Sequence, residues 1–166
     1  KLLWMNGQYI RDTEDKIFRK LFLNSIQESI SRELFDEELN RIDKIVKSVQ
    51  ERLETMNDIK EQVMFVLDEP FEVNSDDWSD VNTEDGQKYM KNVREKFMSA
   101  NNFELNDIEV IMREELKALD LKPKIGFQIT RVAVTGTKVS PPLFESIYAL
   151  GKETTIARLA ESIEDL

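Results

Sequence analysis

Residues 36–56 read DEELNRIDKIVKSVQERLETM, and this stretch decides the fold class. The acidic sequence Asp36-Glu37-Glu38 opens it, and apolar residues then recur every three or four positions. That spacing is the period of one face of an α-helix. We therefore predict a long amphipathic helix whose buried face carries Leu39, Ile42, Val46, Val49, Leu53 and Met56.

Helical spacing continues upstream and downstream of this stretch. Apolar residues within 17–30 predict an earlier helix with Thr13 as its N-cap. After the long helix, Asp58 and Glu61 form a capping-box pattern, which predicts a short helix that Glu69-Pro70 stops. Three consecutive helices are therefore expected before residue 70.

The residues after 83 repeat the pattern of a capping residue followed by spaced apolar side chains. Residues 125–133 fit both the alternation of a strand and the period of a helix. Because no second strand of comparable strength is present to pair with them, a helix is preferred. The predicted helix starts are Thr83, Asn106 with Glu109, Ser140 with Pro141 and Thr154, and Gly151 is a predicted stop.

The segment 70–83 separates the two groups of predicted helices. It is polar and acidic and contains turn-forming residues, which indicates a connection. A chain of 166 residues is long enough for one ordinary domain or two small ones. We therefore predict an all-α fold, a helical bundle or superhelix of two small subdomains over residues 1–72 and 73–166.

Charge is unevenly distributed along the chain. The net charge at pH 7 is −10, yet residues 121–160 contain six Lys or Arg and only two Glu. Between Val66 and Gln87 there are eight acidic residues and no basic one. An acidic body with one basic end suits a protein that meets a polyanion at one place, although an uneven surface without function fits equally well.

The composition removes several classes of function. Without cysteine the chain has no disulfide or thiolate metal site, and without histidine it lacks the commonest general base. No nucleophile–base constellation is evident, so we predict no catalytic and no metal-binding residue, and a complete small enzyme is disfavoured. No apolar run approaches the ~20 residues that span a bilayer and no secretory signal is present. We expect a cytoplasmic chain without membrane contact.

Two segments resemble the bacterial-type glutamyl-tRNA synthetases, which are class I ligases. The first, KLLWMNGQYIR at residues 1–11, is similar to the stretch that leads from the catalytic half into the anticodon half. The second lies between Lys122 and Glu153, contains KPK, RVAVTG, SPPLFE and LGKE, and resembles the C-terminal signature. The resemblance implies the C-terminal anticodon-binding region alone, an all-helical module of two subdomains that grips the anticodon loop of tRNA-Glu.

The same resemblance implies what this chain lacks. The family's catalytic motifs, one similar to His-Ile-Gly-His and one to Lys-Met-Ser-Lys-Ser, belong upstream of Lys1, and neither is present here. We therefore expect a fragment that is not an enzyme by itself and binds no cofactor. ATP and magnesium would be bound by the missing catalytic domain of the same chain. That domain and tRNA-Glu are the expected partners, and we expect a monomer.

Four residues of the C-terminal signature match positions that lie at the anticodon in the family: Gln128, Arg131, Ser140 and Leu143. Arg131 follows Gln128 by three residues, so the two can share a helix face. Both side chains can form hydrogen bonds with a base edge or a phosphate. Structural roles compete, because Ser140 is also an ideal helix cap and Leu143 lies on an apolar face that suits a core.

Further cations are possible phosphate contacts, namely Arg41, Lys122, Lys124 and Lys138; a solvated surface position is the structural alternative for each lysine. On a helical wheel, Arg41 and Arg52 fall together on one flank of the buried face. A ligand could meet the scaffold there, or the two long side chains could simply cover the edge of the core. Alignment with the family places Arg52 at the position associated with the third anticodon letter.

Two functions from different classes remain. The first is anticodon recognition, and the alternative is an acidic helical protein-interaction scaffold without RNA binding. The acidic stretch 66–87 favours the scaffold, whereas the basic cluster in 121–160 favours RNA. Trp4 and Tyr9 could stack on bases, but a core position or an interface toward the catalytic domain explains them better. The sequence leaves strict and relaxed tRNA choice both open.

Overall fold

The chain forms two groups of helices joined by a short connection. The computed structural model describes residues 2–164, with side chains from Asn6 onward, and this range contains ten α-helices, one 3-10 helix and no strand. The all-α prediction is therefore confirmed. The helices are α1 (Leu2–Asp12), α2 (Asp15–Gln27), α3 (Asp36–Arg52), α4 (Asp58–Val63), η1 (Met64–Val66), α5 (Ser75–Val81), α6 (Glu84–Ser99), α7 (Leu105–Ala118), α8 (Pro123–Thr135), α9 (Leu143–Leu150) and α10 (Lys152–Ser162).

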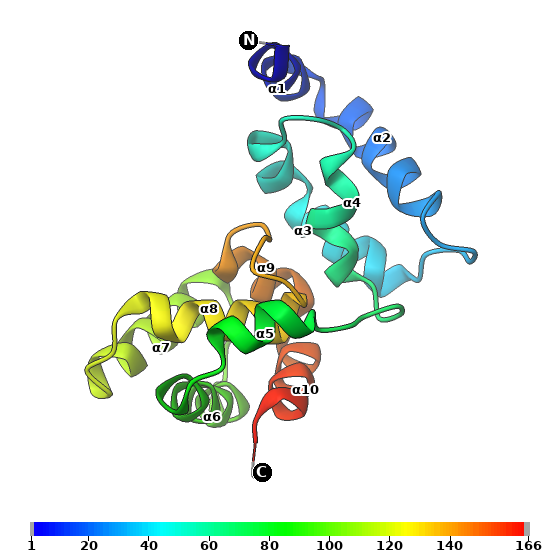
Figure 1. Ribbon diagram of the computed structural model, residues 1–166. Helices are drawn as coiled ribbons and strands as arrows, with labels where there is room; N and C mark the ends of the chain where they lie inside the picture. The colour runs from blue at the N-terminus through cyan, green and yellow to red at the C-terminus, as the bar shows by residue number, and fades with distance from the viewer. Residues whose placement is uncertain (1, 165–166) are drawn as a thin grey trace.

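We call α1–α4 with η1 the N-terminal lobe and α5–α10 the C-terminal lobe. Figure 1 shows the two lobes side by side, with the chain termini at opposite ends of the molecule. The predicted boundary between residues 72 and 73 falls in the connection between η1 and α5. Helix α3 of the N-terminal lobe packs against α9 of the C-terminal lobe, which brings the two lobes into contact.

The buried face of α3 is turned relative to the predicted one. Ile42, Ile45 and Val49 are fully buried, whereas Leu39 and Val46 are only half-buried. The reason is that two charged residues on the Ile45 side, Glu38 and Arg41, are buried as well. The apolar period alone could not show this, because these two side chains bind backbone groups elsewhere in the chain.

Several predicted helix ends are confirmed. The Thr83 hydroxyl accepts a hydrogen bond from the Gly86 N–H at 3.1 Å, as expected for the N-cap of α6. Gly151 ends α9 with a φ of 83°. Residues 125–133 are helical and lie within α8.

Other predicted caps are wrong, because local side chains satisfy the backbone in a different way. The Thr13 hydroxyl donates to the Tyr9 carbonyl, and α2 begins only at Asp15. The capping pair of α7 is Glu104 with Asp107, two residues before the predicted Asn106 and Glu109. The last helix begins at Lys152, before the predicted Thr154.

The segment predicted to be a connection contains the helix α5. Its N-cap is Asn74, whose side-chain oxygen accepts from the Asp77 N–H at 2.9 Å. Trp78 supplies the apolar contact that holds this short helix on the C-terminal lobe, where α5 packs against α8. Five polar residues out of seven hid this helix from a periodicity argument.

Two buried arginines bind the backbone of residues 65–74, which include the end of η1 and lead to α5; we use the name connection for this whole segment. Arg158 of α10 donates to the carbonyl oxygens of Phe65, Leu67 and Val134 at 2.7–3.0 Å. Its guanidinium also lies over the Phe71 ring, 3.6 Å from the centroid. Burial, together with the charge of Arg41, lowers the pKa of Arg158 to about 10.

Arg41 of α3 grips the same segment from the N-terminal lobe. It donates to the Val66 carbonyl at 2.9 Å, to the Asp68 carboxylate at 2.7 Å and to the Thr154 hydroxyl at 3.0 Å. Because Thr154 belongs to α10, this single side chain ties both lobes to the connection. The arrangement fixes the lobes relative to each other through polar contacts.

Glu38 also binds the connection, and we call Arg41, Arg158 and Glu38 together the polar joint. Its carboxylate is fully buried and accepts two hydrogen bonds from Arg32, one from the Phe35 N–H and one from the Asp68 N–H. Burial by itself would raise the pKa of Glu38, but these hydrogen bonds outweigh it and hold the pKa below its ordinary value.

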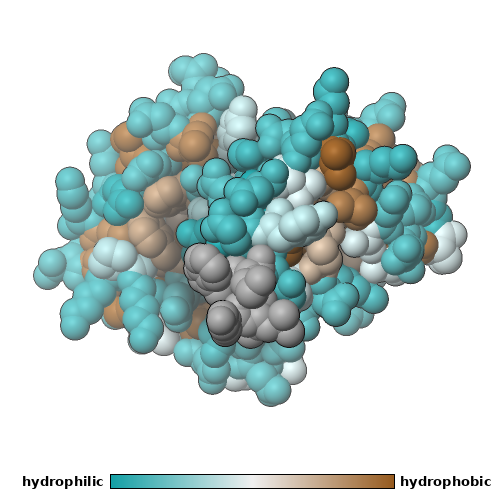
Figure 2. All heavy atoms as spheres, turned by 90° about the horizontal axis from the view of Figure 1, so that it is seen from above, coloured by the Kyte–Doolittle hydropathy of each residue, from teal (hydrophilic) through white to brown (hydrophobic). Residues whose placement is uncertain are grey.

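One face of the molecule is mainly hydrophilic. Figure 2, viewed from above the orientation of Figure 1, shows hydrophilic residues over most of that face and hydrophobic ones in separate groups. Among the described residues, no helix is both long and apolar enough to cross a membrane.

Replacing Arg158 with methionine should strongly destabilise the fold. The substitution leaves three carbonyl oxygens without their buried donor, and each buried acceptor left unpaired costs about 1–3 kcal/mol. Urea unfolding measures this loss. The control is Arg19→Met, which removes a half-exposed ion pair and should cost less than about 1 kcal/mol. Equal midpoints for the two variants would contradict the role assigned to Arg158.

Replacing Glu38 with glutamine should destabilise the fold in a pH-dependent way. Because the folded-state pKa of Glu38 is lowered, its ionised form stabilises the fold above the unfolded value near 4.5. That stabilisation is lost as the pH falls through the folded-state pKa. The gap in unfolding free energy between wild type and Glu38→Gln should therefore be largest at neutral pH and shrink below pH 4.5. Exposed Glu37→Gln serves as the control and should show little effect at any pH.

Candidate nucleic-acid interface

Arg131 is the centre of the predicted site. It projects from α8 and is half-buried, and its Nη1 donates to the Ser140 hydroxyl and to the Pro141 carbonyl at 2.8 Å. Both acceptors are neutral and belong to the α8–α9 loop, residues 136–142. The contact holds the guanidinium in one orientation and leaves its positive charge without a carboxylate partner among the described residues.

The charged group that shifts the pKa of Arg131 is another cation, Arg52. Burial lowers the pKa of Arg131, and the positive charge of Arg52 lowers it further. Arg52 is exposed at the last position of α3, in the N-terminal lobe. The two guanidinium groups belong to different lobes, and their positive charges oppose each other. Such a pair favours a ligand that brings negative charge or several hydrogen-bond acceptors.

Ser140 and Leu143 have different structural roles. The prediction of Ser140 as a helix N-cap is wrong, because α9 begins at Leu143 and its N-cap is Pro142. The Ser140 hydroxyl instead receives the hydrogen bond from Arg131. Leu143 is only 5% exposed and belongs to the hydrophobic core, so its predicted structural role is present. Contact of either residue with RNA stays a prediction.

Gln128 lies one turn before Arg131 on α8 and is half-buried. It lines a small hollow together with Lys124, Asp80 and Thr83, at the edge where α8 meets α5 and the start of α6. Arg131 does not line this hollow and binds the α8–α9 loop instead, so a shared contact of Gln128 and Arg131 with one ligand stays a prediction. Lys122 and Lys124 are exposed at the beginning of the same helix.

Two possible phosphate contacts are instead engaged by the protein. Arg41 does not lie with Arg52 on the surface; it is 6% exposed and binds the connection, which corrects the predicted flank. Lys138 is exposed, but its Nζ forms ion pairs with Asp77 and Asp80 of α5. Arg158, a further cation of the basic segment 121–160, is also buried. No local sequence signal could reveal these partners, because they lie 24–113 residues away.

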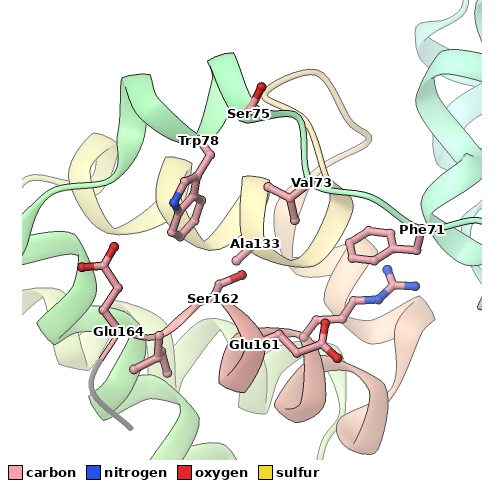
Figure 3. A pocket seen from close by; sticks show the side chains of 10 residues that line it. Phe71, Val73, Ser75, Trp78, Ala133, Glu161, Ser162 and Glu164 are labelled. Carbon is pink, nitrogen blue, oxygen red and sulfur yellow. The ribbon is translucent and has the colours of Figure 1, made fainter.

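An open cleft in the C-terminal lobe is a separate feature. Figure 3 shows Trp78 of α5 and Ala133 of α8 lining it opposite Glu161 and Ser162 of α10. None of the predicted site residues lines this cleft. Among the described residues, no group of three or more His, Cys, Asp or Glu side chains could hold a metal ion.

Comparison with known proteins gives the cleanest indication of ancestry. A family model described as an anticodon binding domain matches residues 18–163. A glutamate–tRNA ligase of Symbiobacterium thermophilum is 33% identical over 165 residues, covering 96% of this chain and 33% of the relative. A glutamate–tRNA ligase of Cutibacterium acnes is 30% identical over 167 residues, covering 96% and 34%.

A solved structure shares the fold. The crystal structure of a glutamate tRNA ligase from Elizabethkingia meningosepticum matches with a TM-score of 0.77 and 21% sequence identity, covering 99% of this chain and 32% of that one. The chain spans about a third of the length of the curated relatives that it matches.

Proposed function

The chain belongs to the anticodon-binding domain family, and on this premise we propose that it recognises the tRNA anticodon as part of a glutamate–tRNA ligase. The observation that carries the proposal is the pair formed by Arg131 and Arg52. The positive charge of Arg52, from the other lobe, acts on Arg131, which is half-buried and has only neutral hydrogen-bond partners among the described residues. A half-buried cation with neutral partners is stabilised when a polyanionic ligand binds beside it.

The chemistry of an anticodon loop fits this arrangement. Splayed bases present donors and acceptors on their pairing edges, and the phosphates between them carry the negative charge. Arg131 keeps donors free beyond those that hold the α8–α9 loop, since a guanidinium has five N–H groups. Gln128, one turn away, can both donate and accept, which suits recognition of a base edge.

The remaining functions of the ligase are proposed for the part that this chain does not span. The name glutamate–tRNA ligase belongs to the full-length relatives, and this chain covers about a third of their length. We propose that glutamate activation, with ATP and magnesium, belongs to the other two-thirds and that this chain alone does not catalyse it. A cytoplasmic monomer that contacts its own catalytic domain and tRNA-Glu is the matching assembly.

The acidic scaffold is the weaker alternative. Its main support was the acidic stretch 66–87, but two of those carboxylates already pair with Lys138 and one pairs with Arg41. The acidic groups therefore serve the fold in part. Binding of a basic protein without any binding of tRNA would favour the scaffold again.

Replacing Arg131 with alanine should weaken tRNA-Glu binding by about 1–3 kcal/mol, the value of a charge-assisted contact. Arg131→Lys keeps the charge but not the fork, so it should recover only part of the loss if a base edge is read. Exposed Lys91→Ala on α6 removes one charge away from the site and should bind almost normally. Filter binding at several salt concentrations gives the affinities, and each phosphate contact contributes a slope of about −0.7 on a single strand. We expect a modest total slope, on the order of −2 to −4.

An unchanged affinity for Arg131→Ala would remove this residue from the interface. A large fall in melting temperature together with lost binding would make Arg131 a structural residue only.

Replacing Arg52 with glutamine should reduce discrimination at the third anticodon letter. Glutamate and glutamine anticodons carry cytosine and guanine there. Arginine can donate to the acceptors on cytosine's pairing edge, whereas guanine presents donors at the same positions. With guanine the guanidinium donors stay unpaired, which costs about 1–3 kcal/mol of binding free energy. A glutamine amide can rotate to suit either base. The measurement uses two tRNA-Glu transcripts that differ only at this letter.

The outcome separates three roles for Arg52. A narrowed gap between the two transcripts supports base recognition. Equal weakening of both transcripts would make Arg52 a phosphate contact, and no change would place it outside the interface.

A further inference from the structure

The α8–α9 loop is held at both ends by the protein. Its first residue, Gly136, has a φ of 87°, and its carbonyl accepts from the Asn74 N–H at 2.8 Å. A Cβ at this position would collide with the Glu72 carbonyl oxygen, so the connection runs directly against the loop. Farther along, Arg131 binds Ser140 and Pro141.

Lys138 fastens the middle of the loop to α5. Its backbone N–H donates to Asp77 Oδ2 at 2.9 Å, and its Nζ donates to Asp80 Oδ2 at 2.5 Å. The same Nζ lies 3.9 Å from Asp77 Oδ1. One residue thus contacts α5 through both its backbone and its side chain, two positions before Ser140.

We propose that Asp77 and Asp80 are positioning residues for anticodon recognition, acting through Lys138 on the loop that orients Arg131. The proposal rests on the proposed function and adds to it two acidic residues that touch no RNA. It also assigns Lys138 to the protein scaffold and not to a phosphate. Anchoring at α5 and at Arg131 leaves the loop one conformation, so less entropy is lost when RNA binds.

For the removal of Asp77, the proposal predicts a change in RNA affinity opposite to the one that charge alone predicts. A carboxylate near RNA repels phosphates, so removing it should strengthen binding if charge alone matters. If Asp77 positions the loop, removing it should weaken binding in spite of the lost repulsion. Asp76 provides a matched control, because it is an exposed acid in the same first turn of α5.

The experiment compares Asp77→Ala and Asp76→Ala in this 166-residue chain, with tRNA-Glu transcript as the probe. Asp77→Ala should bind about five- to tenfold more weakly, the value of roughly one hydrogen bond. Asp76→Ala should bind within about twofold of wild type or more tightly. Asp77→Asn keeps an acceptor for the Lys138 N–H and should lie between wild type and Asp77→Ala.

Two further measurements separate positioning from contact. Amide hydrogen exchange of residues 136–142, without RNA, should be faster in Asp77→Ala and unchanged in Asp76→Ala. Lys138→Ala should lower affinity without changing the salt slope, whereas loss of a phosphate contact would reduce the slope by about 0.7. The double variant Lys138→Ala with Asp77→Ala should be no weaker than the poorer single variant.

The results distinguish this inference from the function on which it rests. If wild type binds tRNA but Asp77→Ala binds as tightly as Asp76→Ala, the positioning role is wrong and the proposed function stands. Unchanged exchange of the loop in Asp77→Ala also overturns the positioning role. If wild type does not bind tRNA at all, the proposed function fails, and the positioning role for anticodon recognition fails with it.

Discussion

The binding of backbone carbonyls by buried guanidinium groups is the interaction on which the rest of the structure depends. Arg158 of α10 and Arg41 of α3 satisfy consecutive carbonyl oxygens at Phe65, Val66 and Leu67. The next residue donates its N–H to the buried Glu38. The first residues of the connection, 65–67, can therefore be buried without leaving these polar groups unpaired. Because side chains from both lobes hold it, the lobes have one relative orientation.

This polar joint has an electrostatic cost that the sequence balances locally. Two arginines near each other disfavour both charges, which is part of why the pKa of Arg158 is lowered. The Asp68 carboxylate pairs with Arg41 and opposes the effect, and the Phe71 ring covers Arg158. The charges of Arg52 and Arg131 also repel each other, but within residues 2–164 no carboxylate forms an ion pair with Arg131. The charges of Arg41 and Arg158 are thus compensated by groups of the protein itself. Arg52 and Arg131 can instead accept a negatively charged ligand.

Local features of the fold could be predicted from the sequence, whereas features that depend on distant partners could not. Thr83 and Gly151 mark helix ends through their own backbone chemistry, and both were predicted correctly. The resemblance carried by the first and last segments is confirmed by relatives that match nearly the whole chain. The burial of Arg41 could not be predicted, because its acceptors lie on the connection and on α10. The α5 helix was missed for a similar reason, since its stability depends on Trp78 packing against another element.

The close approach of Gly136 to the connection has a consequence for engineering. Every residue other than glycine carries a Cβ, and at position 136 that atom would collide with the Glu72 carbonyl oxygen. The positive φ of this position is also one that residues with a Cβ rarely adopt. Position 136 therefore has no acceptable replacement among the genetically encoded amino acids. A variant library intended to change the proposed anticodon recognition should keep this position constant and place its diversity at exposed residues such as Val139.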